Sequence, residues 1–502
     1  MSVIVPARDE ARTIARVVRN AKGVDPRTEV IVVANGSNDA TAAAARRAGA
    51  RVVRYREALG HDVGRAIGAR AARGDILVFA DADFVLPAST LRSFVRAVRG
   101  GRDVVLNRYS GFADERNLHS TSEAKRLLNR LLGRSDLVGS SMTAVPHAIR
   151  RDVAERIGFE RLAVPPLAQT AAISAGFSVE RGRYVPVAEL NRRRKEQGGA
   201  ASVERLILGD HAEAIGWLTD RRGSRAGFTD LGRRRELIDE APAESVPPLP
   251  SGMDPRLSVV IVARNEEETI RSVIQRAKRL YPEEIVAVVN GSTDRTAEIA
   301  KSLGARVIEY AEPLGHDVGR AIGAKRARGE VLLFLDGDIA VDPDALWPYV
   351  AACRLGADIA LNDLNPFYVS ARMIDSVSMA KRFLNRMAGV PGLGFASLTA
   401  VPHAMTRAAA ERIGFRHLAV PPLAQAIAVA NGLTVKLAPG VDVFGTNRKR
   451  ETNTDAYGEN VVEQLILGDH AEAIRWLQTR FGARIRFPDV VRKRELCGMT
   501  RA

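Results

Sequence analysis

Two pairs of aspartates with the spacing Asp-x-Asp are the residues best placed to do chemistry. Asp81 and Asp83 form one pair, Asp336 and Asp338 form the other, and each pair closes a run of apolar residues. On an extended chain residues two apart point to one side, so the carboxylates lie about 6–7 Å apart. This spacing suits a divalent cation, Mn²⁺ or Mg²⁺, held together with phosphate oxygens of a ligand. Aspartates also end strands as turn formers, but the repeated context favours a ligand site.

The run LGHDVGRAIGA occupies residues 59–69 and recurs letter for letter at 314–324. Asp62 is a candidate N-cap of a helix whose free amides and positive dipole end face the aspartate pair. Gly64 would let a ligand approach the backbone, and Arg65 can reach a phosphate. Taken alone, the run is equally compatible with helix packing.

The run belongs to a duplication of the whole chain. Matching segments continue to the end, including LILGDHAEAI at 206–215 and 465–474, at offsets of 255 to 259 residues. A period this long is not a solenoid repeat, so the sequence predicts two tandem homologous domains. We place the first domain at 1–237 and the second at 256–498, joined by a Pro-rich linker at 238–255.

Each copy alternates strand-like and helix-like segments. In the first copy SVIVPA, EVIVVANG and DILVFADAD predict strands, and EARTIARVVRNAK and DATAAAARRAGA predict helices. Strands that alternate with helices of about 10–15 residues predict an α/β fold with a mostly parallel sheet covered on both faces. Ligands of such sheets bind beyond the carboxyl ends of the strands.

Polar residues gather at these carboxyl ends in both copies. The first two strands end in Pro-Ala-Arg-Asp-Glu and Asn-Gly-Ser-Asn-Asp, the third leads into the eleven-residue run, and the fourth ends in the aspartate pair. All four therefore converge on one rim, where we expect the ligand.

Together these motifs resemble the GT-A fold glycosyltransferases of family 2. The resemblance rests on VIVPARDE at 3–10, VIVVANGSNDAT at 30–41, DAD at 81–83 and their counterparts in the second copy. It implies two tandem GT-A domains (nucleotide-diphospho-sugar transferase, Rossmann-like). It also implies a metal-dependent glycosyltransferase of hexosyltransferase type, with two donor sites, that takes a sugar from a UDP- or GDP-linked nucleotide sugar.

The resemblance further implies roles for individual residues. Asp83 and Asp338 would bind the metal. The nucleotide sugar would be held by Pro6, Arg8, Glu10, Asn35, Gly36, Ser37, Asp39, Arg65 and Asp81 in the first copy, and by Arg264, Glu266, Asn290, Gly291, Ser292, Asp294, Arg320 and Asp336 in the second. Because the family often has an aspartate where this chain has Asn35 and Asn290, the choice between uridine and guanosine stays open.

The acceptor half departs from the family pattern. Inverting members usually carry a Glu-Asp type pair whose aspartate takes the acceptor's proton, but this chain has AVPPLAQ at 163–169 and 419–425, without a carboxylate. His147 and His403 are the candidate catalytic residues, as bases or as partners of the diphosphate or metal, with a structural role equally open. A retaining mechanism, as in the glucosyl-3-phosphoglycerate synthases that the chain also resembles, needs no protein base.

Other polar groups have simpler interpretations. Asp210, His211 and Glu213 lie in the repeated LILGDHAEAI segment, where a solvated or capping role on an amphipathic helix is favoured over catalysis. The basic clusters at 191–194 and 447–450 suit a phosphate-bearing acceptor or the diphosphate, with solvated surface as the simpler interpretation.

Composition narrows the class of protein. The 502 residues carry a net charge of +15, but aromatic residues make up only 5% and nucleic-acid motifs are missing, so no nucleic acid is expected. Met1 is not followed by a signal-peptide pattern, and no apolar stretch approaches the length of a membrane helix, which predicts a cytoplasmic protein. Two cysteines indicate neither a disulfide framework nor a metal site. Basic surface leaves peripheral contact with anionic lipid, and a phosphorylated or lipid-linked acceptor, open.

Two other functions stay open. A nucleotide-sugar binding or scaffold protein without turnover is favoured by the missing carboxylate pair and disfavoured by two intact Asp-x-Asp motifs. A nucleotidyltransferase shares the architecture, but it usually has a glycine-rich loop after the first strand, where this chain has Pro-Ala-Arg-Asp-Glu. A dinucleotide dehydrogenase is disfavoured because neither first strand leads into Gly-x-Gly-x-x-Gly.

Overall fold

The computed structural model describes most of the chain as two compact units of similar fold. The described residues are 1–109, 118–187, 199–247, 249–250, 252–370, 374–443, 460–489 and 492–498. Unit 1 comprises Met1–Leu218 and Ala483–Ala502, and unit 2 comprises Thr219–Gly482.

Unit 1 is built on a seven-stranded sheet of order β3-β2-β1-β4-β6-β5-β7. All neighbouring strands are parallel except β6, which runs antiparallel to β4 and β5. The strands are β1 (Ser2–Ala7), β2 (Glu29–Asn35), β3 (Arg51–Tyr55), β4 (Ile76–Phe79), β5 (Val104–Leu106), β6 (His147–Arg150) and β7 (Val179–Arg181). The helices are α1 (Ile14–Lys22), α2 (Thr41–Arg47), α3 (Val63–Ala71), α4 (Ala88–Arg99), α5 (Ser120–Leu131), α6 (Arg151–Ile157), α7 (Pro165–Ser174) and α9 (Gly199–Arg222).

Unit 2 repeats this topology with the strand order β10-β9-β8-β11-β13-β12-β14. Its strands are β8 (Leu257–Ala263), β9 (Glu284–Asn290), β10 (Arg306–Tyr310), β11 (Val331–Asp336), β12 (Ile359–Asn362), β13 (His403–Thr406) and β14 (Val435–Ala438). Its helices are α10 (Glu236–Glu240), α11 (Ile270–Lys278), α12 (Thr296–Ser302), α13 (Val318–Arg326), α14 (Pro343–Arg354), α15 (Ser376–Met387), α16 (Arg407–Ile413), α17 (Pro421–Ala430) and α18 (Val461–Phe481).

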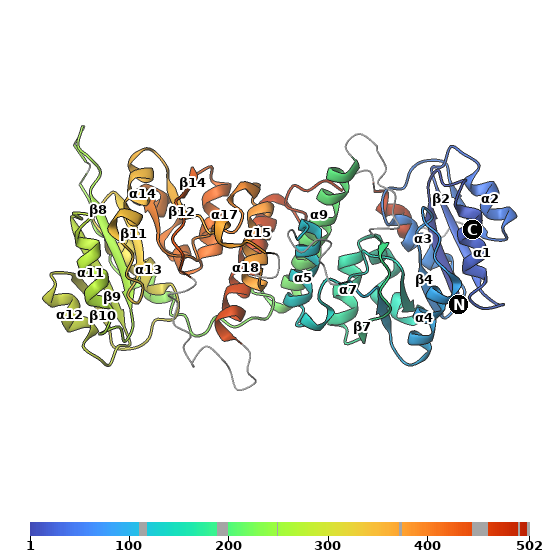
Figure 1. The fold of residues 1–502 in the computed structure, drawn as a ribbon, viewed down its shortest axis with the longest axis horizontal. Coiled ribbons are helices and arrows are strands. Elements are labelled where there is room, and N and C mark those ends of the chain that lie inside the picture. The colour runs from blue at the N-terminus through green and yellow to red at the C-terminus, as the bar shows by residue number, and fades with distance from the viewer. Residues whose placement is uncertain are drawn as a thin grey trace. The chain divides into compact units, whose positions relative to one another are not determined.

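Helices cover both faces of each sheet, so the central strands are apolar throughout. In unit 2, α11 and α12 lie on one face and α13 on the other (Figure 1). Residues 31–33 of β2, Ile-Val-Val, have no exposed surface, which is the pattern of a parallel strand buried on both faces. The predicted fold class, an α/β fold with two mostly parallel sheets, is confirmed.

Helix α3 packs against β1 and β2 through two glycines. A Cβ atom at Gly64 would lie 3.1 Å from Pro6 Cβ, and one at Gly68 would lie 2.4 Å from Ile4 Cγ2. The backbone of α3 therefore lies close to the sheet. We expected Gly64 to let a ligand approach the backbone. In the structure the missing side chain makes room for Pro6 of the strand beneath the helix.

The compact units differ from the predicted domain boundaries. Residues 219–237, at the end of the first sequence repeat, pack in unit 2, and the C-terminal segment from Ala483 packs in unit 1. The predicted linker at 238–255 also overlaps the end of α10. The C-terminal segment of each sequence repeat therefore packs in the unit that contains most of the other repeat.

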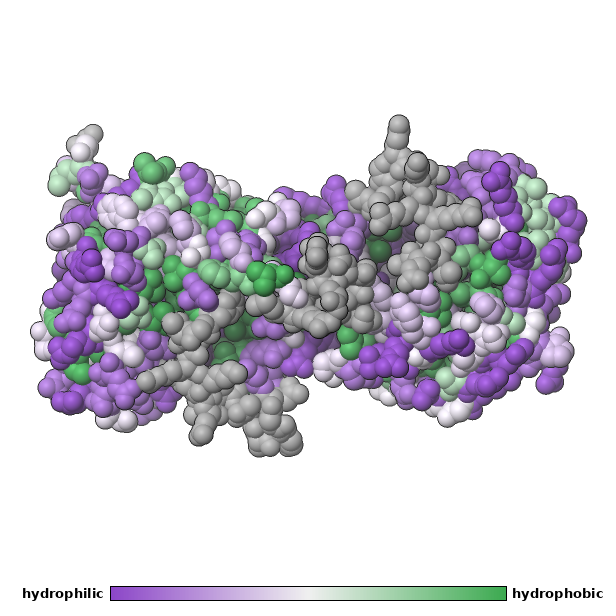
Figure 2. Space-filling model, in the orientation of Figure 1, coloured by the Kyte–Doolittle hydropathy of each residue, from purple (hydrophilic) through white to green (hydrophobic). Residues whose placement is uncertain are grey.

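No helix in the described part of the chain is long and apolar enough to cross a membrane. The face shown in Figure 2 is mostly hydrophilic, with hydrophobic residues scattered between hydrophilic ones.

The close helix–sheet packing makes a prediction for unit 2. Gly323→Ala in α13 would place its Cβ 2.4 Å from Val260 Cγ1. Overpacking costs about 1–3 kcal/mol, which exceeds the gain of up to about 1 kcal/mol from alanine in a helix. We expect a lower midpoint of urea unfolding, followed by circular dichroism. Gly392→Ala is the matched control, because no neighbouring atom lies within 4 Å of its added Cβ. Equal midpoints for both variants would contradict this packing.

Candidate active site

The first two strand ends of each unit are joined into one rim. The Asp9 amide donates to Ser37 Oγ (3.2 Å), and the Asp9 carboxylate accepts from the Asn38 amide (2.8 Å). In unit 2, Asn265 makes the equivalent bonds at 3.0 and 2.8 Å. Both residues have a left-handed backbone, with φ of 53° and 55°, which asparagine and aspartate tolerate better than most residues. Either residue also supplies the accepting oxygen, so the two copies keep the same loop.

Asp39 continues this loop network. Its carboxylate accepts from the backbone amides of Ala11 (3.0 Å) and Thr41 (2.9 Å), and Asp294 makes the same contacts in unit 2. Burial alone would raise the pKa of Asp39, but its hydrogen bonds with Thr41 and Ala11 hold that pKa below its usual value. Within unit 1, Ser37 and Asp39 therefore hold the rim together, and their contact with a nucleotide stays a prediction.

The other predicted residues of the first strand end divide into exposed arginines and residues that are half-buried or buried. Arg8 and Arg264 are exposed at the rim. Glu10 and Glu266 lie beneath it, and each accepts the hydroxyl of the threonine three residues later, at 3.0 and 3.3 Å. Pro6 lies under the start of α3. The arginines are thus the members of this group placed to meet a ligand.

Asn35 ties the end of β2 to the repeated LGHD loop. Its amide nitrogen donates to the Gly60 carbonyl (3.2 Å), and its oxygen accepts from the Leu59 amide. Asn290 accepts from the Leu314 amide (3.2 Å) in the same way. An aspartate cannot donate a hydrogen bond, so the double contact of Asn35 explains an asparagine where family members often have aspartate. Gly36 and Gly291 follow with φ of 59° and 61°, a conformation that glycine adopts without strain.

The central feature of the rim is an ion pair between the α3 arginine and the first aspartate of Asp-x-Asp. Arg65 Nη2 lies 3.5 Å from Asp81 Oδ1, and in unit 2 Arg320 Nη2 donates to both oxygens of Asp336 at 2.8 and 3.1 Å. Burial raises the pKa of Asp81, and the charge of Arg65 opposes that shift. The structure thus brings the predicted residues of α3 and β4 together.

The loop before α3 differs from the prediction. Asp62 has a left-handed backbone (φ 64°), and its side chain does not cap the helix. Instead its carboxylate lies 3.2 Å from Arg65 Nε, and the equivalent Asp317 pairs with Arg320 at 2.7 Å. The predicted N-cap role was wrong, because a carboxylate one turn from an arginine gains more from the ion pair. Each arginine is therefore held between two aspartates.

Asp83 and Asp338 lie half-buried at the same strand ends. Within the described residues no three His, Cys, Asp or Glu side chains form a metal cluster. A pair of carboxylates nevertheless fits Mg²⁺ or Mn²⁺, because such ions commonly keep several waters and phosphate oxygens as ligands. The donor set fits a cation shared with a bound diphosphate, with Asp83 or Asp338 as the protein ligand.

His147 starts β6 and is held rigidly as a neutral ring. The ring stacks on Phe79, with the two ring centroids 4.7 Å apart. Since a carbonyl can only accept, Nδ1 donates to the Ala144 carbonyl (3.0 Å), which leaves Nε2 as an acceptor. Burial, together with the charge of Arg65, lowers the pKa of His147 to about 3. Such a ring is a weak base but a suitable hydrogen-bond acceptor or metal ligand.

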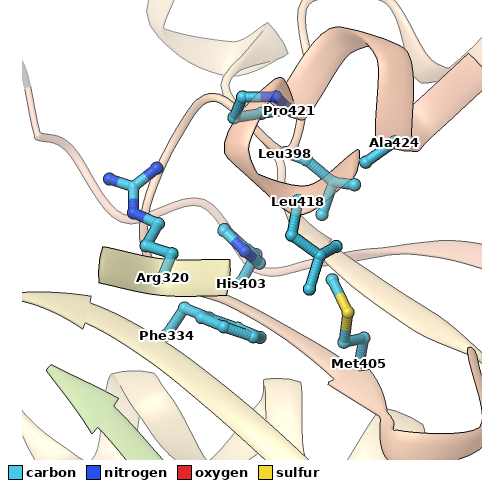
Figure 3. A pocket seen from close by; sticks show the side chains of 8 residues that line it. All are labelled: Arg320, Phe334, Leu398, His403, Met405, Leu418, Pro421 and Ala424. Carbon is cyan, nitrogen blue, oxygen red and sulfur yellow. The ribbon is translucent and has the colours of Figure 1, made fainter. Parts of the chain in front are cut away.

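The equivalent His403 lines a small pocket in unit 2. Figure 3 shows its ring beside Phe334, between Arg320 and the hydrophobic side chains of Leu418 and Met405. Burial and the charge of Arg320 lower the pKa of His403 to about 3 as well. Within the pocket, Arg320 and His403 are the polar groups beside an apolar wall.

Comparison with known sequences decides the family. The profile of Glycosyl transferase family 2 matches residues 2–158 and 258–363, which is more than half of the chain. The chain belongs to glycosyl transferase family 2. The matched segments contain the rims of both units, and the predicted tandem GT-A organisation is confirmed.

The individual relatives share only a short segment of moderate sequence identity with this chain. The 4,4'-diaponeurosporenoate glycosyltransferase of Staphylococcus aureus (strain USA300) is 28% identical over 132 residues, which are 24% of this chain and 34% of the relative. The chain thus spans about a third of the length of that curated relative.

Solved structures show low overall similarity. Glucosyl-3-phosphoglycerate synthase from Mycobacterium tuberculosis, in complex with Mn²⁺, UDP and phosphoglyceric acid, is 21% identical. The match covers 44% of this chain and 78% of that chain, with a TM-score of 0.33. The same enzyme with Mn²⁺, UDP-glucose and phosphoglyceric acid is 20% identical, over 46% of this chain and 81% of that chain, with a TM-score of 0.34.

The segment AVPPLAQ stands where family 2 enzymes usually carry their carboxylate pair. Its polar residue, Gln169, is buried in α7, where it accepts from the Met142 amide (2.9 Å) and donates to Asn129 (2.7 Å). The Met142 carbonyl in turn accepts from Arg65 Nη1 (3.1 Å). Gln169 therefore supports the loop that orients Arg65, and it offers no base.

A lysine near Arg65, and its counterpart in unit 2, were not predicted. Burial and the nearby charge of Arg65 lower the pKa of Lys125 in α5 to about 8. Burial also lowers the pKa of Lys381 in α15, although Asp375 opposes the shift. A desolvated cation beside Arg65 adds positive charge where an anion would bind. The signal in the sequence was the repeated pattern Ala-Lys-Arg-x-Leu-Asn-Arg, present at 124–130 and 380–386.

The predicted solvated role of Asp210, His211 and Glu213 was wrong. Asp210 and His211 are 2% and 0% exposed, and Asp210 is paired with Arg484 at 2.6 Å. Burial lowers the pKa of His211 to about 3, and its Nε2 has no hydrogen-bond partner among the residues that the structure describes. The basic clusters predicted at 191–194 and 447–450 lie outside the described residues.

Because four histidines are buried, we predict that they stay neutral at pH values at which an exposed histidine would be protonated. His147, His211, His403 and His470 have pKa values of about 3 to 4, because each ring is desolvated. We expect all four rings to stay neutral between pH 8 and about pH 5.5, measured by NMR of ¹⁵N-labelled histidine rings.

Each ring signal is assigned with a His→Gln variant. The control is the same protein in urea, where the four signals should titrate near pH 6.5. A folded-state midpoint near 6.5 for His147 would contradict its desolvated position.

Proposed function

We propose that each unit is a donor site for a nucleoside-diphosphate sugar and that the protein transfers the sugar to an acceptor hydroxyl. The observation that carries this proposal is the arginine held between two aspartates at the rim, beside the second Asp-x-Asp carboxylate, in both units. Membership of glycosyl transferase family 2 supports the class of reaction.

The rim offers different chemistry along its length. The joined loops after β1 and β2 present backbone and hydroxyl groups and an exposed arginine, which suit a nucleoside. Arg65, with the desolvated Lys125 near it, supplies positive charge for the diphosphate. A divalent cation bound at Asp83 would offset the charge of the leaving diphosphate.

The proton of the acceptor needs a destination. Gln169 occupies the place of the usual carboxylate and is engaged in structural hydrogen bonds, and His147 is a weak base. We therefore assign the proton to a phosphate oxygen of the leaving group. The bond from the sugar's anomeric carbon to that phosphate breaks, the bond to the acceptor oxygen forms on the same face, and the anomeric configuration is retained.

A binding protein without turnover is the second candidate. The observation that favours it is the same replacement of the carboxylate pair by the mostly buried Pro-Pro-Leu-Ala-Gln. The two candidates differ in product. Release of free UDP or GDP from the sugar donor, with an acceptor mixture present, supports transfer, and binding without release supports the second candidate.

Nucleotide binding provides a test of the two sites. Titration calorimetry of UDP and of GDP with Mn²⁺ should reveal two metal-dependent sites per chain. Asp83→Asn and Asp338→Asn should each weaken one of them by about 100-fold, since losing a charged contact costs about 2–3 kcal/mol.

Glu283→Gln is the control, because this exposed residue directly precedes β9, at the amino ends of the parallel strands and so at the edge of the sheet opposite the rim. It should leave both sites intact. Binding that is unchanged by either site variant would contradict the metal assignment. If neither nucleotide bound in a metal-dependent way, the donor-site proposal would fail.

A further inference from the structure

Two arginine-rich segments follow the long helices α9 and α18 in the chain. We name residues 223–237 the first tail, and the described residues 483–489 and 492–498 the second tail. Their sequence pattern suggests solvated charge, but the side chains of Arg233 and Arg492 have no exposed surface. The first tail packs in unit 2 and the second tail in unit 1. Each tail therefore belongs in sequence to one repeat and in packing to the other.

The first tail is anchored by Arg233. Within unit 2, its guanidinium donates to both oxygens of Asp469 at 2.6 and 2.8 Å. It also donates to the His316 carbonyl (2.9 Å) and to Asp317 (3.2 Å), both in the LGHD loop. Arg225 donates to the same Asp469 at 2.6 Å. The tail thus fixes the loop that opens α13.

This anchor leads directly to the Asp-x-Asp motif. Asp317 pairs with Arg320 at 2.7 Å, and Arg320 pairs with Asp336 at 2.8 Å. A chain of four charged side chains, Arg233 to Asp317 to Arg320 to Asp336, therefore joins the first tail to the rim of unit 2. Alternating charges in a buried network hold one another in place, so removing one end loosens the others.

The backbone of the first tail also docks closely. The Arg234 amide donates to the Leu314 carbonyl (2.9 Å). Gly315 has φ of 83°, and a Cβ there would lie 2.8 Å from Arg233 Cα. A left-handed conformation with no room for a side chain explains the glycine in the LGHD run. The backbones of the first tail and the LGHD loop therefore pack closely against each other, in addition to the ion pairs between their side chains.

The second tail repeats two of these contacts in unit 1, the ion pair with the α9 aspartate and the backbone bond to the LGHD loop. Arg492 donates to Asp210 and to the Ala163 carbonyl, beside the start of α7. The Lys493 amide donates to the Leu59 carbonyl (2.9 Å), and Arg70 of α3 donates to the Cys497 carbonyl (2.9 Å). The tail therefore holds both the LGHD loop and α3 of the first repeat.

We propose that each tail positions the donor site of the other repeat. Arg233, from the first repeat, is a positioning residue for Arg320 and the Asp-x-Asp motif of the second. Arg492, from the second repeat, anchors the tail whose Lys493 amide holds the corresponding loop of the first. The identification of these loops as parts of donor sites rests on the proposed function. The contacts of the tails themselves do not require a ligand.

Hydrogen exchange of the full chain, read by mass spectrometry, tests whether each tail stabilises the LGHD loop of the other repeat. The variant pair Arg233→Met with Asp469→Asn removes the first anchor without leaving a buried charge unpaired. Exchange in residues 314–324 should become about tenfold faster, as expected when a charged hydrogen bond is lost, and exchange in 59–69 should not change. Arg492→Met with Asp210→Asn should give the opposite pattern. The flanking residues of the two identical runs differ, so their peptides are distinguishable.

Arg234→Met is the matched control, because its exposed side chain pairs with the exposed Glu236. It should leave exchange in both runs unchanged. Acceleration in both runs, in neither, or only in the run of the mutated tail's own repeat would overturn the proposal. Calorimetry of UDP with Mn²⁺ is a separate readout: the first variant pair should weaken only the site that depends on Asp338. If the protein bound no nucleotide, the exchange pattern would still decide the role of the tails.

Discussion

The arginine of α3 or α13, held between two aspartates, is the interaction on which the rest of the site depends. A carboxylate in a recess at the end of a buried strand is costly unless a cation accompanies it, and the guanidinium provides that cation. Arg320 contacts Asp317 and Asp336 at 2.7 and 2.8 Å, and Arg65 contacts Asp62 and Asp81 at 3.2 and 3.5 Å. A fixed arginine then becomes a positive centre beside the aspartate carboxylates of the rim.

Several elements of the fold serve to place that arginine. Glycines bring its helix onto the sheet, Asn35 ties the loop before the helix to β2, and Gln169 supports the carbonyl that binds Arg65. Motifs that are far apart in the sequence are therefore parts of one structural unit. This explains why the repeated letters include residues, such as the glutamine of VPPLAQ, that perform no chemistry.

The sequence predicted the sheet and the location of the rim because both follow from local patterns. Apolar runs of strand length, helical spacing between them and polar strand ends were enough to place Asp81, Asp83 and Asp39 at one edge. The buried charges were not predictable in this way. Asp210, His211 and Arg233 look like solvated residues, since the pattern of a helix cannot say which polar face meets another segment of the chain. Asp62 was taken for a cap because the sequence does not reveal that Arg65 competes for its carboxylate.

Duplication has preserved the rim more closely than its surroundings. Lys381 lies near Asp375, but the corresponding position before α5 is His119, and Arg65 is the charge that acts on Lys125. The two units thus keep the same arginine–aspartate arrangement with different charges beside it. The shared arginine–aspartate arrangement is consistent with the proposal that both units bind the same kind of nucleotide donor. The charges that differ between the units are those near Lys125 and Lys381.

The central claim is that both rims bind a divalent cation together with a nucleoside diphosphate. The most direct measurement is an anomalous difference map from crystals of the full chain soaked with MnCl₂ and UDP. The account predicts two manganese peaks, one within ligand distance of Asp83 and one of Asp338, each beside diphosphate density that faces Arg65 or Arg320. Manganese and diphosphate bound elsewhere, with both rims empty, would contradict it.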